Sequence, residues 1–169
     1  MTVNLSLSKV YKEKAFQVAL KDLLEEHIIN LQPDLLAKQL QGFFEDYPLS
    51  LDDFPREEGK YTRTVILQHE SGFEVMAARW SRGTISPIHG HPWFNFYSIV
   101  HGCLKMDDYM MEKQGLRLIL SGKIHENEAA FFVGEQGKFD NNIHKVYALE
   151  ETLSIHISSD DSTKGKIYS

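Results

Sequence analysis

The sequence predicts a mainly β protein, in which a small β-barrel follows an N-terminal helical cap. Two observations carry this prediction. Residues 1–50 hold two segments with helical spacing of apolar residues, and the rest of the chain alternates short β-forming runs with turn residues. The 169 residues suffice for one substantial core, so we expect a single domain over 1–169, with the cap at 1–50 and the barrel at 58–160.

The two helices are expected at about 11–30 and 33–46. In the first, "YKEKAFQVALKDLLEEHIIN", apolar side chains recur at helical spacing with charged residues between them. The second, "PDLLAKQLQGFFED", has a proline in its first turn, where a backbone N–H is not needed for the helix. Packing accounts for both segments, and neither is assigned a functional role.

The β-runs begin with "YTRTVILQ" at 61–68 and end with "LSIHIS" at 153–158. There are roughly eight of them, at the spacing that is typical of an all-β barrel or sandwich. The final residues, "SSDDSTKGKIYS", are polar and are expected to form an exposed tail.

Composition argues against several classes of protein. The formal net charge of −6 opposes binding to phosphate backbones, so nucleic acid is not an expected partner. Cys103 is the only cysteine, which excludes an internal disulfide framework and a C-x-x-C zinc site. Without an apolar run long enough for a signal peptide or a membrane span, the chain is expected to be cytoplasmic, with no membrane partner.

The stretch "SPIHGHPWFNFYSIVHG" at 86–102 places His89 and His91 two residues apart in a β-forming run. Side chains at this spacing share one face of a strand, so both imidazoles are able to bind one metal ion. The alternative is that one of them only caps a turn near Pro87 or Pro92.

A third ligand would have to come from another strand. His144 and His156 both occur in β-runs, and a barrel is able to bring either back to the first pair. The remaining four histidines are interpreted as surface, edge or solvated residues: His27, His69, His101 and His125.

The segment "GTISPIHGHPWFNFYSIVHG" resembles the first signature of the cupin barrels. Gly83, His89, His91 and Gly102 fall into register with that signature, while its usually acidic position holds Asn95. The resemblance implies a cupin-type jelly-roll β-barrel.

More specifically, the chain from about 61 to 158 resembles the cysteine dioxygenase family of thiol dioxygenases. The matching pieces, in order, are "YTR" at 61–63, Trp80, "SPIHGH", "IHKV" around 144 and "LSIHIS". This resemblance implies that His89, His91 and His144 hold Fe(II). Imidazole also suits zinc, nickel and copper, so the ligand set alone does not select iron.

The resemblance further implies that both atoms of O2 are added to the sulfur of a small thiol, L-cysteine first, giving cysteine sulfinic acid. In the family an arginine at the position of Arg63 binds the substrate carboxylate, to which a planar guanidinium is well suited. A salt bridge on the strand is the alternative for Arg63. Tyr61 is expected to flank the pocket or to belong to the core, and Ser154 and His156 match a catalytic hydrogen-bonded relay beside the iron.

Two positions depart from the family. Ser158 stands where the family has a tyrosine, and Asn95 where some members have a cysteine crosslinked to that tyrosine. Tyr97 or Tyr147 would supply a replacement hydroxyl, unless both are ordinary barrel aromatics. Cys103 is expected to be a buried strand residue.

These departures keep other functions open. The substrate would be 3-mercaptopropionate or another thiol, or the protein would be a non-catalytic cupin that binds metal as a sensor. A metal-free sugar isomerase or epimerase would use a histidine as base, but it leaves the histidine cluster unexplained. The family resemblance favours a monomer.

Overall fold

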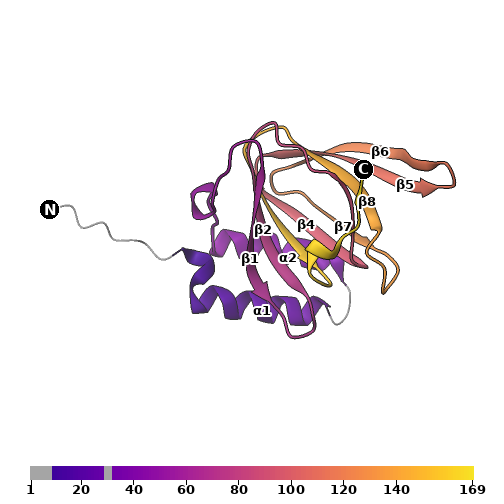
Figure 1. Cartoon of the computed structure of the whole chain (residues 1–169). Coiled ribbons are helices and arrows are strands. Elements are labelled where there is room, and N and C mark those ends of the chain that lie inside the picture. Colours follow the sequence, from indigo (N-terminus) through magenta and orange to yellow (C-terminus); the bar gives the residue numbers. More distant parts are fainter. Residues whose placement is uncertain (1–8, 29–31) are drawn as a thin grey trace. The chain divides into compact units, whose positions relative to one another are not determined.

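The computed structural model of the protein describes residues 9–28 and 32–169 (Figure 1). These fall into two compact units, of which the first ends at Leu49 and the second spans Ser50–Ser169. Within the described residues, no helix is both long and apolar enough to cross a membrane.

The first unit contains the two expected helices, α1 (Lys14–Ile28) and α2 (Pro33–Asp46). The first begins later than predicted because a separate 3₁₀ turn, η1 (Val10–Lys12), precedes it, and its predicted end at residue 30 lies outside the described residues. Both helices contribute to an aromatic contact, in which the rings of Phe16 and Phe43 lie 5.1 Å apart.

His27 does not lie at the surface as predicted. It is 2 % exposed, and its Nε2 lies 2.7 Å from Oε1 of Gln39. His27 therefore lies on the buried, apolar face of α1, where Gln39 of α2 provides a hydrogen-bond partner for its ring. His101 and His125, in contrast, are exposed, as the sequence predicted.

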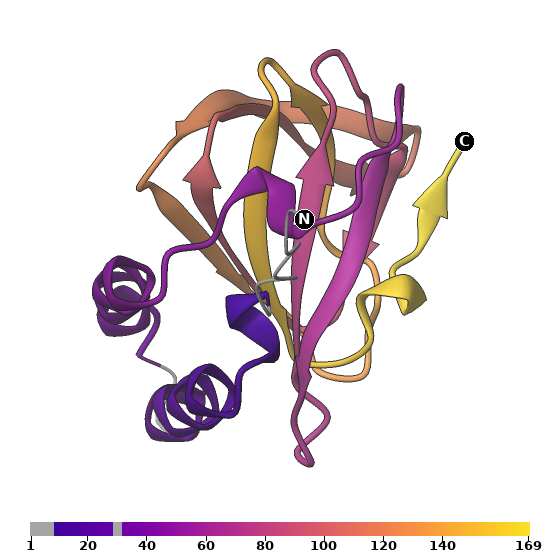
Figure 2. The same cartoon turned by 90° about the vertical axis from the view of Figure 1, so that its left-hand side faces the viewer.

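The second unit consists of two five-stranded sheets in which every paired strand is antiparallel (Figures 1 and 2). One sheet contains, in order, β1 (Tyr61–Gln68), β2 (Glu74–Trp80), β9 (Thr152–Ser158), β4 (Phe94–His101) and β7 (Ala129–Val133). The other contains β10 (Ile167–Tyr168), β3 (Ile88–His91), β8 (Asn141–Ala148), β5 (Cys103–Glu112) and β6 (Gly115–His125). Two further 3₁₀ turns are η2 (Leu51–Asp53) and η3 (Ser162–Lys164).

The core of this unit forms between the two sheets. Trp80, Tyr97 and Ile99 from the first sheet join Met106 and Val146 from the second in one buried cluster. Burial of each large apolar side chain contributes about 1.5–3 kcal/mol, which makes this interior the main source of barrel stability.

The motif that suggested the barrel is divided between two strands. Pro92 lies between β3 and β4, where its missing N–H ends the ladder of the first strand. Gly102 joins β4 to β5 with φ +87°, and a Cβ there would lie 2.4 Å from the carbonyl oxygen of Glu151. Only glycine fits that turn, which accounts for the last glycine of the motif.

The C-terminal residues are partly exposed, as their polarity predicted, but they are bonded to the barrel and do not form a free tail. Ser158 and Ser159 are buried, and β10 adds to the second sheet by pairing Ile167 with His89 of β3. In Figures 1 and 2 this segment, drawn in yellow, lies along the barrel. Its contacts are made largely by backbone groups, which a pattern of apolar side chains does not reveal.

Candidate metal centre and adjoining cavity

Three histidines from two neighbouring strands converge inside the barrel. His89 and His91 come from β3 and His144 from β8, and the register places His89 directly opposite His144. One ligand nitrogen from each lies within 4.8 Å of the others. The three residues predicted as metal ligands are therefore brought together by the pairing of β3 with β8.

The electrostatic state of these side chains suits a cation. Burial lowers the pKa of His89 and places the pKa values of His91 and His144 well below the usual range, so all three are neutral near pH 7. A neutral imidazole keeps a lone pair on one ring nitrogen, as a metal ligand requires.

The distances fit one ion as well. The Nε2 atoms of His91 and His144 are 3.0 Å apart. Two nitrogens that each bind one ion at about 2.1 Å, at a right angle to each other, lie about 3.0 Å apart. The Nδ1–H of His89 donates to the carbonyl oxygen of Pro87 at 2.9 Å, which leaves its Nε2 with the lone pair. The residues present thus fit a bound metal ion.

The histidines line a cavity of about 240 Å³. One water molecule needs only about 10–15 Å³ of such space, so the cavity has room for a ligand much larger than water. Tyr61 forms part of the wall and stacks on Trp80, with ring centroids 4.3 Å apart. Tyr61 therefore lines the pocket and also packs against the buried core cluster, so both positions that the sequence left open apply.

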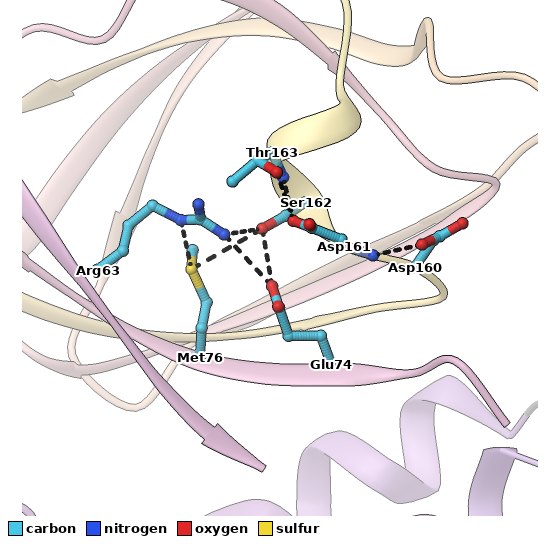
Figure 3. A network of polar contacts seen from close by, with 7 residues as sticks. All are labelled: Arg63, Glu74, Met76, Asp160, Asp161, Ser162 and Thr163. Carbon is cyan, nitrogen blue, oxygen red and sulfur yellow. Dashed lines mark hydrogen bonds and ion pairs between the residues drawn. The ribbon is translucent and has the colours of Figure 1, made fainter. Parts of the chain in front are cut away.

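Arg63 also lines the cavity, and the protein already holds two of its three guanidinium nitrogens (Figure 3). Its Nε lies 2.9 Å from Sδ of Met76, and its Nη2 lies 3.3 Å from Oε1 of Glu74 and also contacts Ser162 Oγ. Nη1 has no partner among the described residues. A carboxylate in the cavity would therefore meet one nitrogen, not the two-nitrogen grip that a free guanidinium offers.

Sequence reasoning missed Glu74 and Ser162. Glu74 is only 4 % exposed and sits in the apolar run "FEVMAARW", on the same strand face as Met76. The available signal was a charged residue on a strand face whose other side chains are apolar and buried. Ser162 lies in the supposed tail, where no signal pointed to the cavity.

Ser154 and His156 are joined by a hydrogen bond. The Trp80 indole Nε1–H donates to Ser154 Oγ at 2.9 Å, and Ser154 Oγ lies 2.8 Å from His156 Nε2. Ser154 Oγ also lies 3.5 Å from the carbonyl oxygen of Ala78, which is a second acceptor for its hydroxyl. His156 lines the cavity.

This burial has a consequence for acid stability. Burial lowers the pKa of His156 to about 3, whereas an unfolded chain titrates near 6.5. The unfolded state therefore binds the proton first as pH falls, and His156 alone is expected to remove about 2 kcal/mol of stability between pH 7 and pH 5. Urea unfolding of the metal-free protein at both pH values measures this loss. His156→Gln should lose less stability over the same interval, and an identical loss in both proteins would contradict the assignment.

The positions that depart from the family lie deep in the first sheet. Asn95 pairs with Ser158 across β4 and β9; it is 1 % exposed, and neither atom of its amide has a partner among the described residues. Tyr97 belongs to the buried cluster, with its ring 6.1 Å from that of His156, and burial raises the pKa of its hydroxyl. Tyr147 packs under the ammonium of Lys105 at 4.7 Å. The wall of the cavity contains neither tyrosine.

Two antiparallel sheets around a buried histidine cluster define a cupin barrel, and solved structures bear this out. No family model matches the sequence, and no curated protein matches it. A double-stranded β-helix protein from Klebsiella pneumoniae has a TM-score of 0.52 at 13% identity, over 73% of this chain and 92% of that one. A cupin superfamily protein from Desulfitobacterium hafniense has a TM-score of 0.50 at 9% identity, over 66% and 87%.

A cupin domain from Schizosaccharomyces pombe is similar to the same degree, with a TM-score of 0.50 at 8% identity over 69% of this chain and 70% of that one. At such low identity these likenesses establish the fold alone. The chain has the cupin fold, and the narrower resemblance to cysteine dioxygenases rests on its sequence motifs.

Proposed function

We propose that the protein is an iron-dependent thiol dioxygenase that acts on a small thiol bearing a carboxylate. The proposal rests on the convergence of three neutral histidines on a cavity that Arg63 also lines. L-cysteine is the first substrate choice, and 3-mercaptopropionate is the second. We further expect a cytoplasmic monomer without nucleic-acid or membrane partners.

The overall reaction needs no reductant. A thiol and O2 combine to a sulfinic acid, in which both oxygen atoms are bonded to sulfur and sulfur has supplied all four electrons. Ferrous iron held by His89, His91 and His144 would supply a site for thiolate and dioxygen and the redox chemistry between them.

The remaining residues bind and orient the substrate. Arg63 Nη1 donates to the carboxylate and fixes the distance from that group to the sulfur. His156 has too low a pKa to serve as a base near pH 7, so it acts through hydrogen bonds, while Ser154 holds the ring through Nε2. Tyr61 and Trp80 exclude water from one wall.

Oxygen uptake by the anaerobically iron-loaded protein tests this function. We expect uptake with L-cysteine or 3-mercaptopropionate and much less with cysteamine, which has no carboxylate. His89→Ala should abolish uptake, while the matched control His125→Ala, at an exposed position, should retain it. Absence of uptake with every thiol, in protein that contains iron, would refute the dioxygenase.

That result would favour a metal-binding cupin that serves as a sensor. Two observations support this second candidate: Glu74 already offsets the charge of Arg63, and Ser158 provides no phenol near the histidines.

A further inference from the structure

The C-terminal segment 160–168 is fixed across one side of the cavity. The Asp161 carboxylate caps η3 by accepting from the backbone N–H of Thr163 at 2.8 Å. The backbone N–H of Gly90 donates to the carbonyl of Lys166 at 2.8 Å, next to the pairing of β10 with β3. The segment is therefore bonded to the strand that carries His89 and His91.

Close contact between two glycines sets the position of this segment. A Cβ added to Gly165 would lie 2.1 Å from the carbonyl oxygen of Gly90, so a side chain there would force the backbones apart. Ser162, Thr163 and Ile167 of the segment line the cavity. The space open to a ligand is thus bounded by residues that follow the last long strand of the barrel.

Ser162 connects this segment to Arg63 (Figure 3). Its hydroxyl accepts from Arg63 Nη2 and donates to Oε1 of Glu74 at 3.1 Å, a better acceptor than Sδ of Met76 at 3.9 Å. Glu74 and Met76 hold the guanidinium from β2, while Ser162 holds it from the C-terminal side. These contacts account for Nε and Nη2 and leave Nη1 for a ligand.

A guanidinium held in this way loses little freedom when a ligand binds. Glu74 offsets the charge of Arg63. The general attraction between Arg63 and an anion therefore contributes less to ligand binding than the fixed direction of the Nη1–H groups. We propose that Ser162 is a positioning residue for Arg63, and that segment 160–168 makes the cavity selective for thiols that carry a carboxylate. This inference rests on the proposed function, because it names the element that selects the substrate.

The test compares Ser162→Ala with Ser162→Thr, which keeps the hydroxyl, and with Ser98→Ala, a serine on β4 outside the cavity wall. Full-length protein is loaded with zinc, which does not support turnover, and titrated with 3-mercaptopropionate and with cysteamine. Loss of the Ser162 contact should weaken 3-mercaptopropionate binding about tenfold, the scale of one hydrogen bond to a charged group. Cysteamine binding and zinc binding should change less than twofold.

Ser162→Thr should restore most of the affinity for 3-mercaptopropionate, and Ser98→Ala should behave as the parent protein. Equal weakening for both thiols, or no weakening for either, would overturn the positioning role. This inference and the proposed function can fail independently of each other. A parent protein that consumes no oxygen but shows the Ser162 effect refutes oxidation alone, whereas normal uptake without that effect refutes this inference alone.

Discussion

His144→Ala is expected to lower metal affinity at least 100-fold, because it removes one of three ligands, and even the outer partners of metal ligands contribute 10–100-fold. His144 is the only one of the three that β8 supplies. Without it, the remaining pair is two residues apart on β3, and no third histidine nitrogen completes the cluster. Isothermal titration of the metal-free variant with zinc measures the change.

His125→Ala is the matched control, since that imidazole is exposed on β6. The control should bind zinc as the parent protein does. Metal also stabilises the folded state that binds it, so zinc should raise the unfolding temperature of the parent and of the control but not of His144→Ala. Unchanged zinc affinity in His144→Ala would remove this residue from the metal site.

Arg63→Met is expected to lower the free energy of unfolding by about 3 kcal/mol, even without any ligand. The variant leaves the carboxylate of Glu74, which is 4 % exposed, without its opposite charge. Breaking a fully buried pair in this way costs roughly 3–5 kcal/mol, and the lower end applies here because the Arg63 side chain is 27 % exposed. Urea denaturation at pH 7 measures the loss. A decrease in activity of this variant is therefore not by itself evidence of substrate binding.

The double variant Arg63→Met/Glu74→Gln should recover most of the stability, because no buried charge is then left unpaired. An exposed pair provides the comparison: Arg56→Met removes the 3.2 Å contact with Glu151 and should cost less than about 1 kcal/mol. If Arg63→Met and Arg56→Met lowered the free energy of unfolding equally, the Glu74 carboxylate would not need Arg63 as its opposite charge.

The sequence was informative wherever side-chain alternation follows backbone geometry. The H-x-H spacing placed His89 and His91 on one face. The β-runs left His144 and His156 as candidates for the third ligand, and the family resemblance selected His144. The barrel was predictable from repeated short strands, and apolar spacing indicated helices at about 11–30 and 33–46, where the structure has helices over 14–28 and 33–46.

Contacts made by polar and backbone groups were not predictable in this way. The run after Ser158 lacks apolar alternation, yet backbone hydrogen bonds and the contact of Gly165 with Gly90 hold it on the barrel. Glu74 has the appearance of an ordinary strand residue until β1 and β2 pair and bring Arg63 beside it. Such pairings depend on tertiary register, which local sequence patterns do not specify.

The most direct test of thiol dioxygenation is to determine where the atoms of molecular oxygen go. Iron-loaded protein is supplied with ¹⁸O2 and 3-mercaptopropionate or L-cysteine, and the mass of the product is measured by mass spectrometry. We expect a sulfinic acid that carries two ¹⁸O atoms, with neither product nor oxygen uptake in His89→Ala. A product with one labelled oxygen atom, or a disulfide formed while oxygen is reduced, would contradict a thiol dioxygenase.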